Sequence, residues 1–324
     1  MVSQKEVDAA ALCDDGMTYN AGFIIIKPTK NSILLYRTLQ ANLQKPGVRF
    51  EQQALNSAVR NLKKQSTGIE VTFLNRQRFR DGSDYFEKPQ RYFAQKRRSP
   101  EKKPQSNDIL VVHNNCIVSK AAKVYRYREN LMWMYDGDDQ YYTSQTRLYL
   151  AYNNQVPFFP LAGFSKVEQA AVTSSEIFAL KAAMTIGYLL NRTVILPRFH
   201  AGPKAVEVPL NFILHMASFD KHFAGNYREN SFLWNPKVPY DVKSKFLKHQ
   251  FVESSTKLAS NLQNVTISNT YVVRQFGGIE DRVLTFPTLH YVFVTLTNTT
   301  KNNAFIGKLE KGFFRSSYRQ YRRW

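Results

Sequence analysis

The chain has 324 residues, 43% of them hydrophobic, which is enough for a sizeable buried core and excludes global disorder. Its 45 lysines and arginines against 25 acidic residues give a formal charge of +20, which favours anionic partners such as phosphates, acidic glycans, nucleic acid or a membrane face. No segment has the apolar length of a signal peptide or of a bilayer-spanning helix, and two cysteines without a CxxC pair indicate neither a zinc cluster nor a disulfide framework.

The first predicted elements are a strand and a helix. The segment NAGFIIIKP, residues 20–28, is typical of a buried strand that ends at a proline. A helix follows to about Leu43, with Asn31 or Ser32 as its N-cap. Four residues are available for the apolar face of this helix: Ile33, Leu34, Leu35 and Leu39.

A second helix and two further strands are predicted after it. The segment FEQQALNSAVRNLKK, residues 50–64, has apolar residues at the spacing of a helix core, namely Ala54, Leu55, Ala58 and Leu62. Residues 70–75 and 108–113 are predicted to be strands, the latter buried from Ile109 to Val112. Because strands and helices alternate, the first half favours an α/β sheet.

Much of the basic excess lies in residues 60–104 and in the tail, residues 315–324. Within the first of these segments, prolines and polar residues at 99–106 predict a mobile surface loop. The tail interleaves arginine with tyrosine and tryptophan, a composition that suits stacking on bases or sugars. No nucleic-acid recognition motif accompanies these charges, so we expect no nucleic-acid partner.

The second half is predicted to be α/β as well. Polar and turn-rich segments between Asp136 and Pro160 predict a domain boundary. Residues 165–190 have a long helical pattern, with Ile177, Leu180, Met184 and Tyr188 near one face. The segment NRTVILP, residues 191–197, then predicts a strand.

Polar side chains gather at the ends of three elements in the first half. An Asn-Ala-Gly triplet opens the first strand, a Glu-Gln-Gln triplet opens the second helix, and a His-Asn-Asn triplet closes the strand at 108–113. The glycine permits close backbone approach, and the amides offer both donors and acceptors. The candidate site residues are Asn20, Gly22, Glu51, Gln52, Asn56, His113, Asn114 and Asn115.

This set of side chains suits a hydroxyl-rich ligand at the rim of a sheet. Its imidazole could complete the oxygen shell of a divalent cation bound to a diphosphate. Each of the three triplets also has an ordinary structural explanation. Asn-x-Gly is common in loops, a first-turn Glu51 stabilises any helix, and a histidine such as His113 is more often structural than a ligand.

Four blocks, in order and spacing, resemble the nucleotide-diphospho-sugar transferase family, which includes plant cell-wall xylosyl- and arabinosyltransferases. They are YNAGFIIIKPT, FEQQALNSAV, FLNRQRFRDGSDYF and ILVVHNNCIVSKAAKVYRYREN, and they cover about Tyr19 to Trp133. A second, weaker resemblance covers parts of Phe158 to Pro239, where LKAAMTIGYLLNRTVILPRF and YRENSFLWNPKVP look like the region that follows the catalytic domain in the arabinosyltransferase branch.

The resemblance implies a GT-A-type glycosyltransferase that moves a sugar from a nucleotide-sugar donor to a glycan or glycoprotein acceptor with the help of Mn²⁺ or Mg²⁺. It places His113 at the late metal-binding histidine and Asn20 and Gly22 on the strand that lines the donor sugar. Gln52 and Asn56 match the family's Asp-Gln helix, where Glu51 replaces the usual aspartate and is the candidate for orienting or deprotonating the acceptor.

The resemblance also leads us to expect an Asp-x-Asp motif upstream of the Asn-x-Gly strand, yet the first 19 residues contain only Asp14-Asp15. Asp136-Gly137-Asp138 has the right letters but lies downstream in a predicted turn, so we do not expect it to bind the metal. The chain is therefore interpreted as the back half of a transferase, a truncated gene product or a diverged copy, that is inactive by itself.

The predicted fold class is α/β, with a partial GT-A-like, Rossmann-like mixed sheet and a second α/β region at the C-terminus. The predicted domains are 1–140 for the transferase portion, 141–160 for a linker and 161–324 for an accessory region like the arabinosyltransferase extension. The family implies the Golgi, to which sequons at Asn191, Asn264 and Asn298 would be suited, and membrane attachment only through an anchor that this sequence does not contain. A non-catalytic glycan-binding protein without the Asp-x-Asp metal site is the alternative function.

Overall fold

The computed structural model describes residues 7–14, 17–87, 109–135, 140–154, 165–201, 206–246 and 265–313. Several predictions lie outside the described residues: the loop at 99–106, the tail at 315–324, Asp15, the Asp136-Gly137-Asp138 segment and the sequon at Asn264. The chain divides into two compact units, the first made of Met1–Pro89 and Arg98–Ile117 and the second of Gln90–Arg97 and Val118–Trp324.

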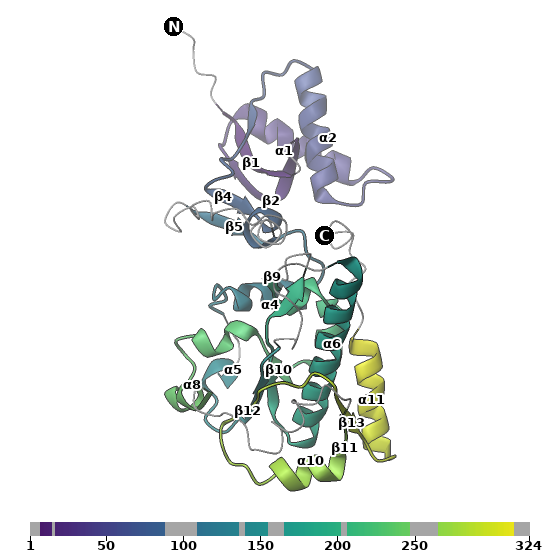
Figure 1. Cartoon of the computed structure of the whole chain (residues 1–324). Helices are drawn as coiled ribbons and strands as arrows, with labels where there is room; N and C mark the ends of the chain where they lie inside the picture. The colour runs from purple at the N-terminus through teal and green to yellow at the C-terminus, as the bar shows by residue number, and fades with distance from the viewer. Residues whose placement is uncertain are drawn as a thin grey trace. The chain divides into compact units, whose positions relative to one another are not determined.

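The first unit contains a three-stranded sheet in the order β2-β1-β3. Its strands are β1 (Ala9–Asp14), β2 (Thr18–Ile26) and β3 (Val71–Phe73). Strands β1 and β2 of this sheet are labelled in Figure 1. The pair β1–β2 is antiparallel with a register shift between Ala11 and Leu12, whereas β1 and β3 are parallel. A separate parallel pair, β4 (Phe79–Asp81) and β5 (Val111–His113), sets Asp81 in register with His113.

Two helices cover the three-stranded sheet, α1 (Lys30–Leu43) and α2 (Glu51–Lys64). The prediction for the core of α2 is confirmed, because all four of its predicted core residues are buried: Ala54, Leu55, Ala58 and Leu62. Of these, Leu55, Ala58 and Leu62 pack with Ala9, Leu35 and Val71, so both helices and the sheet share one hydrophobic core.

The prediction for α1 was wrong in its cap and in part of its face. The N-cap is Thr29, whose hydroxyl accepts a hydrogen bond from the backbone of Ser32 in a capping box. Leu35 is buried and Leu39 packs against the core, but Ile33 and Leu34 are exposed. A 14-residue helix on one sheet buries only a narrow stripe, so three consecutive apolar residues cannot all face the core.

The predicted strands were too long or too buried, and two strands were missed. Strand β2 is half-buried, with Ile25 exposed, and β5 begins only at Val111, after an exposed Leu110. The missed strands are β1 and β4, both of which are shorter than seven residues. Strand β1 is the central strand of the sheet and is hydrogen-bonded to both β2 and β3. The residues before Asn20 therefore supply the central strand.

The second unit is built on a four-stranded sheet in the order β10-β7-β6-β12, and all neighbouring pairs are parallel. Its strands are β6 (Tyr149–Tyr152), β7 (Thr193–Ile195), β10 (Tyr227–Arg228) and β12 (Val283–Phe286). The predicted long helix is confirmed as α6 (Lys166–Leu189), which is labelled in Figure 1. In the chain it lies between β6 and β7. It ends in a left-handed Asn191, with φ of 51°, and the predicted strand β7 follows.

The other elements of the second unit surround this sheet. The helices are α4 (Lys120–Glu129), α5 (Gln140–Thr143), α7 (Met216–Phe223), α8 (Tyr240–Phe246), α10 (Asn269–Phe276) and α11 (Thr300–Gly312), with short 3₁₀ turns η3 (Leu210–Phe212) and η4 (Asn230–Trp234). The small strands are the antiparallel pair β8 (Phe199–Ala201) and β9 (Val206–Val208), and the parallel pair β11 (Val265–Ser268) and β13 (Val292–Thr295).

The predicted fold class is confirmed, because the chain is a mixed α/β protein with several parallel sheets, which is consistent with the expected GT-A-like fold. The units separate between Ile117 and Val118, and the segment 141–160 contains most of α5 and the central strand β6. Cys13 is buried, Cys116 is exposed, and no disulfide joins them. Among the described helices, none combines the length and the apolarity needed to cross a bilayer.

Candidate functional site

The first unit brings three of the predicted site residues together, at strands β2 and β5. The imidazole of His113 lies so close to Gly22 that a Cβ added to this glycine would overlap its Cε1 and Nε2 atoms. The same Cβ would lie 2.9 Å from Oδ1 of Asn20. Only glycine permits this approach. The Asn-x-Gly motif was predicted to allow close approach to its backbone, and the group that approaches it in this structure is the side chain of His113.

Asn20 is 3% exposed, and its Oδ1 accepts a hydrogen bond of 2.7 Å from the backbone N–H of Gly22. This bond fixes the asparagine and the glycine relative to each other on β2. His113 as a whole residue is half-buried. The site therefore combines a fixed backbone turn of β2 with the imidazole that lies against it.

Asn56 holds this wall to helix α2. Its Nδ2 donates to the carbonyl of Tyr19 at 2.7 Å and to the carbonyl of Gln52 at 2.8 Å, while its Oδ1 accepts from the N–H of Tyr19 at 2.9 Å. The amide thus pairs with both backbone groups of the residue that precedes Asn20. In this structure Asn56 positions the strand, and its role as a ligand-binding residue stays a prediction.

Gln52 and Glu51 lie in the first turn of α2, as predicted. Gln52 is half-buried, whereas Glu51 is exposed and has no hydrogen bond or ion pair with any described residue. A carboxylate in this position interacts favourably with the helix dipole, which is a sufficient structural reason for its presence. The role of Glu51 toward an acceptor therefore stays a prediction.

The loop after His113 is tied to the neighbouring strand β4. Asn114 is 5% exposed, and the Oδ1 of Asn115 accepts a hydrogen bond of 2.6 Å from the backbone N–H of Gly82, directly after β4. Because β4 and β5 are parallel and in register up to Asp81 and His113, this bond locks the two strand ends together. Asn115 thereby fixes the position of the histidine.

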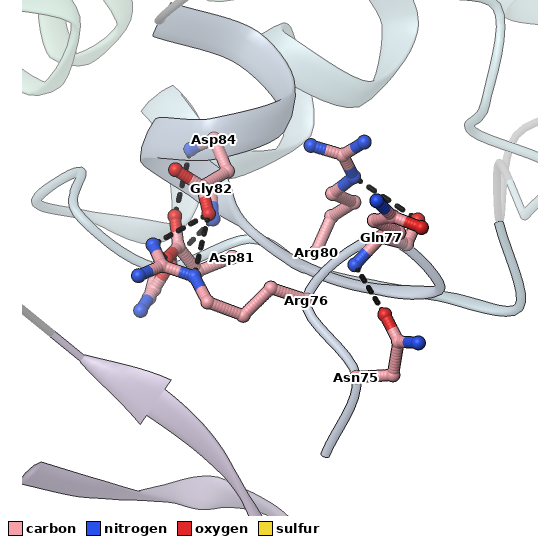
Figure 2. A network of polar contacts seen from close by, with 8 residues as sticks. Asn75, Arg76, Gln77, Arg80, Asp81, Gly82 and Asp84 are labelled. Atoms are coloured by element: carbon pink, nitrogen blue, oxygen red, sulfur yellow. Dashed lines mark hydrogen bonds and ion pairs between the residues drawn. The ribbon is translucent and has the colours of Figure 1, made fainter. Parts of the chain in front are cut away.

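A charged network stabilises the turn that follows β4, as Figure 2 shows. Arg76 donates to Oδ2 of Asp84 through Nη2 at 2.6 Å and Nε at 3.1 Å, and its Nη2 lies 3.5 Å from Oδ2 of Asp81. Oδ1 of Asp81 accepts from the N–H of Asp84 at 2.7 Å. The hydrogen bond and charge of Asp84 raise the pKa of Arg76, so the guanidinium stays charged.

Sequence reasoning missed this network, although the signal was present. The segment FRDGSDYF places an aspartate before a glycine and a second aspartate three residues after the first. That pattern is typical of a turn in which the first carboxylate accepts a backbone N–H bond. Both carboxylates are nearly buried, at 7% and 8% exposure for Asp81 and Asp84.

The carboxylate of Asp8, just before β1, holds several elements of the three-stranded sheet together. Asp8 is 5% exposed and accepts hydrogen bonds from the hydroxyl of Thr29 at 2.5 Å and from the N–H of Glu70 at 2.9 Å. Burial opposes the charge, but these bonds prevail and lower the pKa of Asp8. One side chain thus joins β1, the cap of α1 and the start of β3.

The described residues do not by themselves fit a divalent cation. No group of three or more histidine, cysteine, aspartate or glutamate side chains in the described part of the chain could hold a metal ion. His113 offers one nitrogen, and the nearest carboxylate in register, Asp81, already binds Arg76 and the backbone of Asp84. A cation needs several charged oxygen ligands, and these are not assembled here.

Residues 1–127 match the family model of the nucleotide-diphospho-sugar transferases. This part of the chain belongs to that family. The match covers the whole three-stranded sheet, the β4–β5 pair and most of α4. No curated protein and no solved structure matches the chain.

For this transferase region, the match gives the site at Gly22 and His113 a functional context. Both residues lie on the described strands of the matched region, and the structure brings them into contact. A nucleotide-sugar donor is the ligand class that the family implies. The individual contacts of Asn20, Gln52, Asn114 and Asn115 with such a donor stay predictions.

Proposed function

We propose that the chain is a glycosyltransferase, or a portion of one, that moves a sugar from a nucleotide-sugar donor to a glycan or glycoprotein acceptor. The observation that supports this proposal most is the contact of His113 with Gly22 beside the buried Asn20, within a region of the transferase family. The amide of Asn20 and the imidazole of His113 both lie beside Gly22, and such groups can hydrogen-bond to the hydroxyls of a sugar.

In this proposal the residues of the site bind and orient the donor. Asn20 and the backbone around Gly22 would line the donor sugar, and Gln52 would add an amide from α2. Asn114 and Asn115 hold the strand end that carries His113, so they would set the position of the imidazole. Glu51 would orient or deprotonate the acceptor hydroxyl from the first turn of α2.

We also propose Mn²⁺ or Mg²⁺ as cofactor, on the resemblance to the family. His113 is the ligand that we expect from the described residues, and no step above depends on the cation. Paramagnetic broadening of the His113 ring resonances on adding Mn²⁺ would test this part, and unchanged resonances would contradict it. The Golgi is the compartment that we propose, on the family's account.

The function is tested with the purified chain and a set of UDP-sugars, among them UDP-xylose and UDP-arabinose. We expect calorimetric binding that is weakened in His113→Ala and unchanged in the control His222→Ala, a histidine of the second unit. Release of UDP with an added glycan would establish transfer. Glycan binding without any binding or hydrolysis of UDP-sugars would instead favour the non-catalytic alternative.

A further inference from the structure

Helix α1 of the first unit has a second apolar stripe beside the one that faces the core. Successive residues of an α-helix are turned by about 100°, so Ile33, Tyr36, Gln40 and Leu43 lie along one side of α1, next to the core-facing Leu35. The exposed fraction is 51% for Ile33, 54% for Tyr36 and 43% for Leu43. Single exposed apolar residues are ordinary, but three on one side of a helix form a patch of the kind that binds a partner.

This side of α1 lines a groove that is open to solvent and has a volume of about 520 Å³. The groove is also lined by Ile26, at the end of β2, and by Pro28, two residues beyond it. Because Ile33 and Leu43 are ten residues apart, the groove extends for about 15 Å along the helix. Among the described residues that line it, Arg37 is the one charged side chain, so the groove is mainly apolar.

The groove lies on the side of α1 that faces away from α2. Asn42 is on the other side of Leu35 from Tyr36 around the helix, and its Nδ2 donates to the carbonyl of Ala54 in α2 at 3.3 Å. Strand β2, at the end of which the groove lies, is an edge strand of the described sheet. The layer of helices on this sheet therefore has α2 on one side of α1 and an apolar groove on the other, where a further helix could pack.

The shape of the groove favours a helix over a small ligand or a lipid surface. A pocket for a small ligand encloses most of the ligand, whereas this groove is open along its length. A flat bilayer would touch the exposed Ile33 and Tyr36 but would not reach Ile26 and Leu39, which are half-buried in the groove. A helix can lie lengthwise in such a groove and insert apolar side chains spaced three, four and seven residues apart.

The charge around the groove selects the kind of helix. Residues 27–49 contain no aspartate or glutamate, and their five basic residues are all exposed: Lys27, Lys30, Arg37, Lys45 and Arg49. Carboxylates on the partner would be attracted to this surface. A second copy of the chain, with a formal charge of +20, would be repelled, as would the strongly basic segments 88–108 and 314–324 of the same chain.

We propose that the groove between α1 and the end of β2 binds an amphipathic, acidic α-helix of another protein. The apolar stripe of that helix lies on Ile33, Tyr36 and Leu43, and carboxylates beside the stripe pair with Arg37 and the neighbouring lysines. The groove contains none of the candidate site residues, so this interaction does not depend on the proposed transferase activity.

The test uses the full chain and fluorescence anisotropy of a labelled, hydrocarbon-stapled peptide helix of the length of α1, with one stripe of leucines and glutamates beside it. We expect saturable binding that is roughly tenfold weaker in Ile33→Glu, because the new carboxylate would be desolvated in the groove and would repel the glutamates. Leu34→Glu is the matched control, because Leu34 is a 39% exposed leucine of the same helix that does not line the groove. It should bind as the native chain does.

Gln40→Glu repeats the test should Ile33→Glu fail to fold, which circular dichroism would reveal. Arg37→Glu should weaken binding of the glutamate helix and strengthen binding of a matched helix with lysines in place of the glutamates.

Absence of saturable binding of the glutamate helix would overturn the proposal, as would equal losses in Ile33→Glu and Leu34→Glu or tighter binding of the lysine helix by the native chain. Two further results would assign the groove to another occupant and overturn the proposal. One is a dimer of the native chain in analytical ultracentrifugation that Ile33→Glu abolishes. The other is binding to phosphatidylserine vesicles, but not to the helix, that Ile33→Glu abolishes.

Discussion

The imidazole of His113 lies against the Cα atom of Gly22, at a distance that excludes any side chain at residue 22. Residues 91 positions apart thus depend on each other directly, one at the end of β5 and the other within β2. The position of the His113 ring therefore requires a glycine at residue 22. This requirement cannot be inferred from the residues next to either of them in the sequence.

Replacement of this glycine is the most direct prediction. We expect Gly22→Ala to displace the His113 ring and to lower the free energy of unfolding by about 1–3 kcal/mol, since the new methyl group would overlap the imidazole. Histidine ring NMR signals should shift, and UDP-sugar binding should fall if the site is the donor site. Gly278→Ala is the control, because its Cβ would meet no atom within 4 Å.

Asn56 should be needed for stability as well as for the geometry of β2. Asn56→Ala leaves the N–H and C=O of Tyr19 without their partners, so we expect a loss of about 1–3 kcal/mol. Urea unfolding followed by circular dichroism measures it. Asn61→Ala, on the same helix and without a hydrogen bond of its side chain to a described residue, should cost much less, and equal losses would refute the role of Asn56.

The network beside His113 gives a third prediction. Asp84→Asn keeps the size of the side chain but removes the charge that binds Arg76, so we expect a loss of about 1–2 kcal/mol, discounted because the arginine is 41% exposed. Asp84→Glu keeps the charge in a longer side chain and serves as the comparison. If the Asn variant is as stable as the native chain at low and high salt, the ion pair does not hold this turn.

A pH-dependent prediction concerns Glu129 in the second unit. Burial raises its pKa to about 7, against the opposing charge of Arg198, whose Nη1 lies 2.8 Å from Oε1. The folded state then binds a proton that the unfolded state has already released, so stability falls as the pH rises from about 4.5 to about 7. The total loss should be about 3 kcal/mol.

Urea unfolding between pH 5 and pH 8 measures this loss. Glu129→Gln cannot titrate, so its stability should vary less over that interval than the stability of the native chain. Glu207→Gln, an exposed residue of the same unit, is the control and should leave the slope unchanged. Parallel curves for the native chain and Glu129→Gln would contradict the raised pKa.

The last prediction concerns the contact between α6 and β7. A Cβ at Gly187 would lie 2.8 Å from the carbonyl oxygen of Arg192 and 2.9 Å from Cγ2 of Val194. Because a backbone atom cannot yield as a flexible side chain does, we expect Gly187→Ala to cost about 1–3 kcal/mol. Gly307→Ala, in a helix with open space around it, should instead be neutral or stabilising.

The elements with strong local periodicity could be predicted from the sequence. Helices α2 and α6 show the apolar spacing of a helix over 14 and 24 residues. The predicted face of α2 is buried, as are Ile177, Leu180 and Met184 of α6, whereas Tyr188 is half-buried. Strands β1 and β4 were missed. Their existence depends on pairing with β3 and β5, which no local window contains.

The candidate site could be predicted only in part, for the same reason. The Asn-x-Gly and His-Asn-Asn triplets drew attention by their composition, and the structure brings Asn20, Gly22 and His113 together. What composition could not reveal is which amides are already used by the fold. Asn56 and Asn115 both bond to distant backbone groups, and that depends on tertiary contacts.

The boundary between the two units has a practical consequence for the choice of fragments. The family match ends at residue 127, whereas the units divide after Ile117, so helix α4 lies on the far side of that division. Its Tyr125 is 3% exposed and accepts a hydrogen bond from the N–H of Leu210. A fragment truncated after residue 127 would lack the residues that bury Tyr125, so its apolar ring would be exposed and the fragment would tend to aggregate. A fragment that ends at Ile117 does not contain Tyr125 and avoids this exposure.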